Sequence, residues 1–242
     1  MSHNAERGPE RLDTIRYARA PQAKKKTLTE QLDAEVGLIW AARPDLRLVA
    51  LADGAEENWR YFERPLWKEA IRIVDIGHGC QHLKQAMAAV YGDTVQARAE
   101  YERLRVILRD EQGGVDQVIA QLDRLDRMLY RQGHPRRQKA LAKERTYFRN
   151  QCERMDYARY RAQGLPIGSG IVEAACKTLV TERMKMSGMS WGEGKQPILT
   201  IRSLQQSARW EAAWKLIAET YHTPVEPVAK GRPQLRLVRE AA

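Results

Sequence analysis

The sequence predicts an α/β protein with a long helical insertion. Two short apolar runs, residues 46–51 and 71–74, are separated by about one helix length of chain. This spacing is typical of a strand–helix–strand unit with parallel strands. From residue 84 to 163 the apolar residues recur mainly at helical spacing, and a glycine-rich segment at 164–170 then ends that stretch.

Each element before the insertion follows from its pattern. Residues 12–17 alternate apolar and polar side chains, which predicts a half-buried strand. Apolar residues at spacings of four, four and three predict a helix over about 24–42, and Pro44 ends it. The stretch 55–69 between the two apolar runs predicts a further helix.

The insertion and the C-terminal part are divided by glycines and prolines. Breaks at 91–93, 113–114 and 133–135 predict three or four helices in the insertion. After the glycine-rich segment we expect a helix from Ile171 with Ser169 as N-cap, and a last helix over about 197–221. These boundaries predict four regions: 1–83 (first part of the core), 84–163 (helical insertion), 164–222 (C-terminal core helices) and 223–242 (tail).

The charge balance indicates a polyanionic partner. The chain has 242 residues, with 41 Lys and Arg against 31 Asp and Glu and a net charge of +10. Two stretches concentrate this excess: residues 136–161 have nine basic and three acidic residues, and residues 177–215 have seven and three. DNA is the first candidate, because basic faces on both sides of a site can follow a phosphate backbone.

Three other classes are excluded at this stage. The helical periodicity argues against disorder of the whole chain. No apolar run approaches the roughly 20 residues of a membrane-spanning helix, so we expect no membrane partner. Cys80, Cys152 and Cys176 form no CxxC pair, and the first nine residues contain no apolar leader segment. We therefore expect a cytoplasmic protein without a disulfide framework.

Three carboxylates could meet at one end of the predicted sheet. Asp53 and Asp75 follow the two apolar runs, and Glu173 lies in the first turn of the helix after the glycine-rich segment. Ligands of open α/β sheets bind beyond the carboxyl ends of the strands. Oxygen ligands suit Mg²⁺, and two such ions about 4 Å apart can catalyse displacement at a phosphodiester.

Each carboxylate also has a structural interpretation. Asp53 followed by Gly54 is typical of a simple turn, and Asp75 could cap the next helix. Glu173 is favoured at a helix N-terminus by the helix dipole, and it could pair with Lys177 one turn later.

Other residues of chemical interest have structural alternatives too. Asp75, His78 and His82 have metal-ligand types at helical spacing, but a hydrogen bond between His78 and Asp75 is the simpler interpretation. Cys176 has no matching histidine, so we expect it to be buried. Trp210 and Trp214, spaced by four, are expected to pack rather than to stack on bases.

Together these motifs resemble a known family. Residues 51–59 (Leu-Ala-Asp-Gly-Ala-x-x-x-Trp) and 74–83 (Val-Asp-x-x-His-x-x-x-His-Leu) are similar to the core of bacterial insertion-sequence transposases. Residues 164–177 (Gly-Leu-Pro-Ile-Gly-Ser-Gly-Ile-Val-Glu-Ala-Ala-Cys-Lys) and 183–191 (Arg-Met-Lys-x-Ser-Gly-Met-x-Trp) closely resemble the ISKra family. The similarity extends from about residue 11 to 214, and its Gly-Ser-Gly-x-x-Glu block is highly specific.

The resemblance implies an RNase H-like catalytic core of the DDE type, with a helical insertion before the final glutamate and dependence on Mg²⁺ (or Mn²⁺). Asp53 matches the second aspartate of the acidic triad and Glu173 the closing glutamate, so both would be catalytic metal ligands. Asp75 and His78 match the family's accessory Asp/Cys-x-x-His motif.

The sequence departs from the family pattern at its start. The first triad aspartate is expected on an opening strand of the type Val-x-Val-Asp-Gly, and Asp13 lacks the following glycine. The core is therefore expected to be incomplete, with its first strand missing, as in an N-terminally truncated copy. We expect this chain by itself not to cut or join DNA.

The predicted function is that of a DDE transposase, or its C-terminal fragment, which cleaves and transfers DNA strands during transposition of an insertion sequence. Element ends and target DNA would be its partners, and a homo-oligomer is compatible with this. The DNA contacts expected from the second basic stretch are Lys177, Arg183, Lys185 and Trp191. The alternatives are a catalytically inactive DNA-binding remnant and an RNase H-like nuclease.

Overall fold

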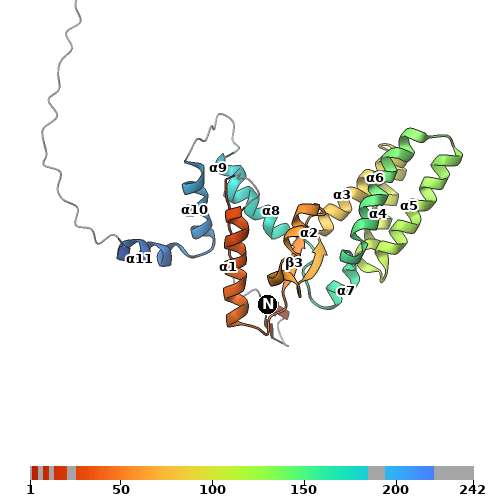
Figure 1. Cartoon of the computed structure of the whole chain (residues 1–242). Helices are drawn as coiled ribbons and strands as arrows, with labels where there is room; N and C mark the ends of the chain where they lie inside the picture. Colours follow the sequence, from red (N-terminus) through yellow and green to blue (C-terminus); the bar gives the residue numbers. More distant parts are fainter. Residues whose placement is uncertain (1, 5–7, 11–13, 21–25, 185–193, 221–242) are drawn as a thin grey trace, which may run out of the picture.

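The structure is a computed structural model that describes residues 2–4, 8–10, 14–20, 26–184 and 194–220 (Figure 1). Two strands at the start, β1 (Ser2–Asn4) and β2 (Gly8–Glu10), pair antiparallel. Helix α1 (Lys26–Ala42) follows and ends before Pro44, as the sequence predicts.

The second sheet is parallel and carries the candidate site. Strand β3 (Val49–Ala52) pairs with β4 (Ile71–Val74), with Val49 opposite Ile71 and Ala52 opposite Val74. The connection contains α2 (Glu56–Tyr61) and a short 3₁₀ helix, η2 (Pro65–Trp67). The described residues are mainly helical and this sheet has two strands among them, which is compatible with the predicted α/β class.

The helical insertion consists of long helices with the predicted breaks. Its elements are α3 (Ile76–Tyr91), α4 (Val95–Asp110), α5 (Gly114–Arg131), α6 (Pro135–Gln151), a 3₁₀ turn η3 (Cys152–Arg154) and α7 (Tyr157–Ala162). Helix α3 packs against α4 and α6, and α5 packs against α4 and α6 (Figure 1). The turn before α5 requires glycine: a Cβ on Gly114 would lie 2.2 Å from the carbonyl oxygen of Ile107.

One hydrophobic core joins the parallel sheet to the insertion. Its fully buried members include Ile73 and Val74 of β4, Leu83 of α3, Leu122 of α5 and Phe148 of α6. Burial of side chains of this size stabilises the fold by about 1.5–3 kcal/mol each. The predicted boundary between residues 83 and 84 falls within α3, and the division into regions stays a prediction.

The C-terminal part is a smaller assembly of helices. Its members are α8 (Gly170–Cys176), a π-helical turn η4 (Lys177–Thr181), α9 (Glu182–Met184), α10 (Lys195–Gln206) and α11 (Trp210–Thr220). The single helix predicted over 197–221 is thus two helices. Ala208 adopts a left-handed conformation with φ of 53°, and the backbone N–H of Arg209 donates to the carbonyl of Leu204 at 2.8 Å, so the chain turns there.

The strand predicted over residues 12–17 is wrong for its described part, residues 14–17, which have no regular secondary structure. The backbone N–H of Arg16 donates to Ser207 Oγ at 2.8 Å, and its guanidinium donates to the carbonyl of Gln206. The alternating pattern reflects packing against the end of α10 rather than pairing in a sheet. The rest of the predicted strand, Leu12 and Asp13, lies outside the described residues.

Helix α1 has no fully buried residue and is attached by polar contacts. Asp33 accepts hydrogen bonds from the Tyr61 hydroxyl at 2.6 Å, from Trp67 Nε1 at 2.9 Å and from Arg64 at 2.7 Å. Glu35 forms an ion pair with Arg209, and this contact holds the pKa of the Glu35 carboxyl below its ordinary value.

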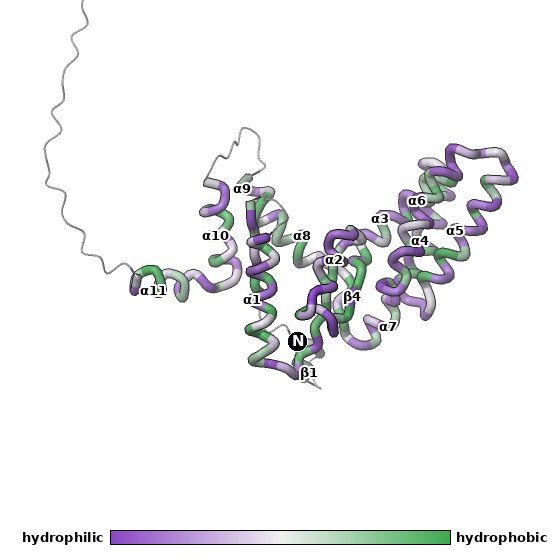
Figure 2. Tube along the Cα trace, in the orientation of Figure 1, coloured by the Kyte–Doolittle hydropathy of each residue, from purple (hydrophilic) through white to green (hydrophobic). Residues whose placement is uncertain are grey.

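Helix α11 also has no buried residue, and Figure 2 shows hydrophobic residues along its trace, away from the parallel sheet and the insertion. Trp210 and Trp214 pack on each other as expected, with stacked rings whose centroids are 6.0 Å apart, although Trp214 is 56% exposed. Among the helices described, none combines the length and the apolar character needed to span a bilayer.

Candidate functional site

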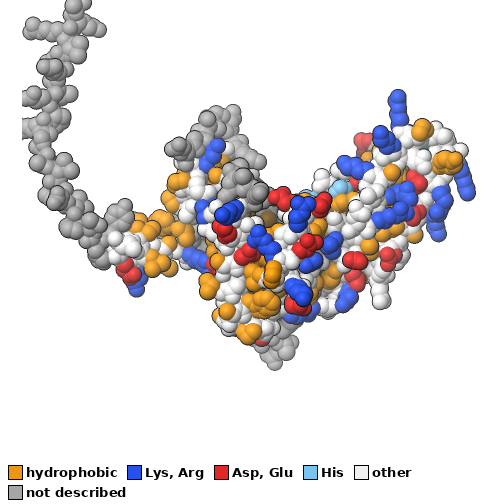
Figure 3. All heavy atoms as spheres, viewed as in Figure 1, with side chains coloured by type: hydrophobic (Ala, Val, Ile, Leu, Met, Phe, Trp, Pro, Cys, Tyr) orange, Lys and Arg blue, Asp and Glu red, His pale blue; other side chains and the backbone are white. Residues whose placement is uncertain are grey.

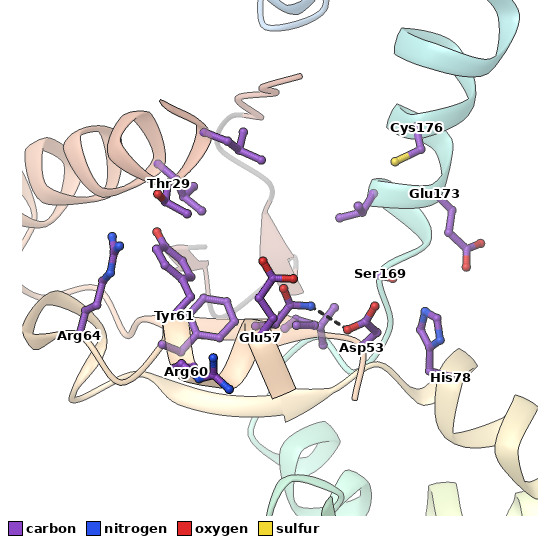
Figure 4. Close-up of a pocket in the computed structure, with 17 residues that line it drawn as sticks. Thr29, Asp53, Glu57, Arg60, Tyr61, Arg64, His78, Ser169, Glu173 and Cys176 are labelled. Atoms are coloured by element: carbon purple, nitrogen blue, oxygen red, sulfur yellow. Dashed lines mark hydrogen bonds between the residues drawn. The ribbon is translucent and has the colours of Figure 1, made fainter. Parts of the chain in front are cut away.

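A cavity of about 680 Å³ lies between α1, the β3–α2 connection and α8. Asp53, His78 and Glu173 all line it, although they come from three separate parts of the chain. Figure 4 shows the imidazole of His78 between the carboxylates of Asp53 and Glu173. The structure therefore brings both predicted metal-ligating carboxylates to one cavity.

Asp53 lies directly after β3, at the carboxyl end of the parallel sheet. Its Oδ1 accepts hydrogen bonds from the backbone N–H of Ala55 at 3.0 Å and from Asn58 Nδ2 at 2.7 Å. These bonds form the turn that the Asp-Gly pair predicts, and they fix the carboxyl group. Within the described residues Oδ2 accepts no hydrogen bond, so one oxygen is free to bind a ligand.

Glu173 lies in the first turn of α8 and is exposed. It forms no ion pair with Lys177 or with any other cation of the described chain, so the pairing considered from the sequence is not present. Lys177 is exposed one turn further on. The Glu173 carboxylate is thus available at the cavity, where the N-terminal end of a helix favours negative charge.

Asp75 has a structural role and is almost fully buried, with 2% of its surface exposed. It caps α3: Oδ1 accepts from the backbone N–H of Gly77 at 2.6 Å and of His78 at 3.2 Å. Its Oδ2 accepts from the backbone N–H of Ser169, just before α8. Since both oxygens bind backbone N–H groups, Asp75 is not placed to hold a cation.

The contact between Asp75 and Ser169 explains how Glu173 reaches the cavity. The neighbouring N–H of Ile76 donates to the carbonyl of Ile167 at 2.9 Å. Together these two bonds hold the segment before α8 against the carboxyl end of β4. Ser169 itself is the N-cap residue of α8 but forms no side-chain cap hydrogen bond, so its predicted position is correct and its predicted cap is absent.

His78 is half-buried at the cavity. Its link to Asp75 runs through its backbone N–H rather than its ring. In the described part of the chain no group of three or more His, Cys, Asp or Glu side chains is arranged to hold a metal ion, so the zinc site considered from the sequence has no support. Cys176, expected to be buried, is exposed and lines the same cavity.

Three further residues beside Asp53 come from α3 and α6, and sequence reasoning missed them. The Tyr147 ring covers Gly54 so closely that an added Cβ would lie 2.3 Å from Cε2. The other face of Tyr147 stacks on His82 with centroids 3.5 Å apart, and His82 Nδ1 lies 2.6 Å from Glu144 Oε2. No sequence spacing signals this cluster, because α3 and α6 meet only in the fold.

Negative charge surrounds the Tyr147 hydroxyl. Burial raises its pKa above the ordinary value, and the nearby charges of Asp53, Asp75 and Glu144 raise it further. The hydroxyl is buried and has no hydrogen-bond partner among the described residues. These carboxylates therefore disfavour ionisation of the Tyr147 hydroxyl.

The outer edge of β3 is unpaired beside the site. Ile71 N–H donates to the carbonyl of Leu48, and Asp75 N–H to that of Ala52, so residues 48, 50 and 52 bond to β4. The alternate residues Val49 and Leu51 direct their backbone groups to the opposite edge, where no described residue pairs with them. This edge could accept another strand.

The donor set fits a hard divalent cation in part. Asp53 and Glu173 offer carboxylate oxygens, and Mg²⁺ binds through one or two carboxylates while it keeps waters and substrate phosphates as its other ligands. Glu57 of α2 also lines the cavity, but the opening-strand aspartate of the expected triad is not found among the described residues there. Of the expected DNA contacts only Lys177 is described in full, because the Arg183 side chain, Lys185 and Trp191 lie outside the described residues.

Comparison with known proteins gives no relative: no protein-family model, curated protein or solved structure matches this chain.

Proposed function

We propose that this chain is a DDE transposase with an RNase H-like core, or the C-terminal fragment of one, a class of protein that cleaves and transfers DNA strands in the presence of Mg²⁺ or Mn²⁺. The observation that carries this proposal is the position of Asp53 and Glu173 at one cavity beyond the carboxyl end of a parallel sheet. The specific resemblance of the Gly-Ser-Gly-x-x-Glu block supports the same conclusion.

Each residue has a defined part in this proposal. A bound divalent cation would activate a water or a DNA 3′-hydroxyl and stabilise the leaving oxygen. Asp53 and Glu173 would hold that cation through their free oxygens. Asp75 positions the helix that carries Glu173, and His78 lies where it could donate a hydrogen bond to a phosphate oxygen.

The open edge of β3 supports the RNase H-like interpretation. The parallel sheet has only two strands among the described residues. Parallel sheets normally have more strands and are buried on both faces. We propose that a further strand, from outside the described residues, pairs with Val49 and Leu51. The third carboxylate would enter the site at the end of that strand, and DNA cleavage would depend on it.

A second candidate is DNA binding without chemistry. It is favoured by the described residues, which contain no group of three or more His, Cys, Asp or Glu side chains arranged to hold a metal ion. A nuclease on the same fold would use the same residues, and joining of DNA ends would distinguish a transposase from it.

Cation binding tests the proposal directly. Mn²⁺ binding to the full chain is measured by electron paramagnetic resonance, for the wild type and for Asp53→Asn, Glu173→Gln and Glu182→Gln. Glu182 is an exposed glutamate that follows η4 and does not line the cavity, so its variant is the matched control. We expect each site variant to lower Mn²⁺ affinity at least about tenfold, because even supporting residues of metal sites are worth that much.

The control variant should bind Mn²⁺ as the wild type does. Equal affinity in all four proteins would overturn the proposed cation site. Duplex DNA binding that persists in Glu173→Gln, with no Mn²⁺ bound by the wild type, would instead establish the binding-only candidate.

A further inference from the structure

The far end of the insertion, where α5 turns into α6, is strongly basic. Between residues 124 and 139 there are six Lys and Arg and one acidic residue, Asp126. Figure 3 shows Lys and Arg side chains projecting from this end of the molecule. We call these six exposed residues the tip patch: Arg124, Arg127 and Arg131 of α5, and Arg136, Arg137 and Lys139 at the start of α6.

The charges of the tip patch are not neutralised within the described structure. The one acid in this stretch, Asp126, is held by Arg145 at 2.9 Å. Arg145 and Arg149 also form ion pairs with Asp123, so Asp123 and Asp126 of α5 pair with the middle of α6. None of the six tip cations forms an ion pair in the part of the chain that the structure describes.

The geometry of the patch suits a row of phosphates. Arg124, Arg127 and Arg131 are spaced by three and four, so they share one face of α5 and extend over about 10 Å of its axis. With Met128 and Gln132, these three arginines line a shallow hollow of about 340 Å³. Tyr130 is 74% exposed beside them, and tyrosine hydroxyls commonly donate to phosphate oxygens.

We propose that the tip patch binds the phosphate backbone of duplex DNA, independently of the cation site. An anionic membrane surface is less suitable, because Tyr130 is the one exposed large hydrophobic side chain between residues 124 and 139 and a membrane-binding helix needs a continuous apolar face. Binding here requires neither a divalent cation nor the third carboxylate.

The position of the tip patch predicts how the duplex would lie relative to the proposed catalytic site. This one prediction rests on the proposed function. Helix α6 rises about 18 Å from its start at Pro135 to Tyr147. Tyr147 covers Gly54, the residue next to Asp53. One turn of B-DNA is about 34–36 Å long, so this rise is about half a turn. The tip patch would hold the duplex about half a turn from the phosphate that reacts.

The test measures binding of the full chain to a short duplex DNA of arbitrary sequence by fluorescence anisotropy, in EDTA and over a range of NaCl concentrations. The tip variant replaces Arg124, Arg127 and Arg131 by Gln. The matched control replaces three arginines of α4 that already pair with neighbouring acids: Arg98 and Arg103, which are exposed, and Arg105, which is half-buried. Both variants remove three positive charges from helices of the same insertion.

Each phosphate contact contributes about 0.9 to the slope of log affinity against log salt, so the tip variant should lower the slope by about 2.7. The α4 variant should leave the slope unchanged. Circular dichroism checks that both triple variants keep their helices. Binding of the wild type to phosphatidylserine vesicles is measured in parallel.

Three results would overturn the proposal: an equal loss of slope in both triple variants, no duplex binding by the wild type, or tighter binding to the vesicles than to DNA. The cation site can fail its Mn²⁺ test without affecting these measurements, so the two proposals are tested separately.

Discussion

Asp75 and Asp53 follow neighbouring strands, but we assign a structural role to Asp75 and a ligand role to Asp53. Substitution by asparagine should therefore destabilise the protein at position 75 and not at position 53. In Asp75→Asn the side chain keeps its shape but gains an NH₂ group. Asp75 accepts three backbone hydrogen bonds, from Gly77, His78 and Ser169, through both oxygens. In either orientation the amide therefore places a donor against a backbone N–H.

The expected cost follows from these contacts. A hydrogen bond to a charged group contributes about 1.5–3 kcal/mol, and only 2% of the Asp75 surface is exposed to solvent. Loss of one such bond and weakening of the other two should lower the free energy of unfolding by about 3 kcal/mol. Asp53 uses only Oδ1 and is half-buried, so Asp53→Asn should change it by less than about 1 kcal/mol.

Urea unfolding followed by circular dichroism measures the difference. With a slope of about 2 kcal/mol per molar urea, Asp75→Asn should lower the midpoint by about 1.5 M. Because the bond to Ser169 holds the helix that carries Glu173, this variant should also bind Mn²⁺ more weakly. Equal midpoints for the two variants would refute the assignment of a structural role to Asp75 and a ligand role to Asp53.

Three further predictions concern other parts of the molecule. Gly54→Ala should destabilise the fold by about 1–3 kcal/mol in urea unfolding, because the added Cβ meets the clamped Tyr147 ring, and the double variant with Tyr147→Leu should recover most of this loss. Glu35→Gln should lower the free energy of unfolding by about 1 kcal/mol at pH 7. Because the pKa of Glu35 is lowered in the folded state, the stabilities of wild type and variant should converge as the pH falls from about 5 to 3. A difference in stability that does not depend on pH would contradict this. Trp214→Ala should change the free energy of urea unfolding by less than about 0.5 kcal/mol, because the ring is 56% exposed and stacks on Trp210; a larger loss would show that α11 is covered.

The sequence predicts the local elements well where the pattern and its boundaries agree. The apolar run 71–74 forms β4 with the predicted bounds, and α1 ends before Pro44 as expected. The insertion breaks where glycines and prolines interrupt the helical pattern, since these residues either adopt left-handed conformations or cannot continue a helix. These features depend on neighbouring residues alone.

Features that depend on tertiary contacts were not predictable from the pattern. Residues 14–17 alternate like a strand, but Arg16 bonds to the end of α10, almost the whole chain length away. The break near Ala208 has no glycine or proline to mark it. The cluster of His82, Glu144 and Tyr147 combines two helices whose approach no spacing encodes.

For the candidate site, the sequence identified the carboxylates but not their separate roles. Asp53, Asp75 and Glu173 each follow or begin an element in the predicted manner. Only the hydrogen bonds show that Asp75 is fully occupied by backbone N–H groups, whereas Asp53 and Glu173 have free oxygens.

Cleavage of the polypeptide by a bound iron ion tests the central claim most directly. Fe²⁺ replaces Mg²⁺ at sites of oxygen ligands, and with ascorbate and hydrogen peroxide it cuts the backbone close to the ion. If Asp53 and Glu173 share one cation, the full chain should be cut near residues 53 and 173 together. Excess Mg²⁺ and the Asp53→Asn substitution should each suppress both cuts. A cut near only one of these residues, or a cut at 173 that survives Asp53→Asn, would show that the two carboxylates do not hold a common ion.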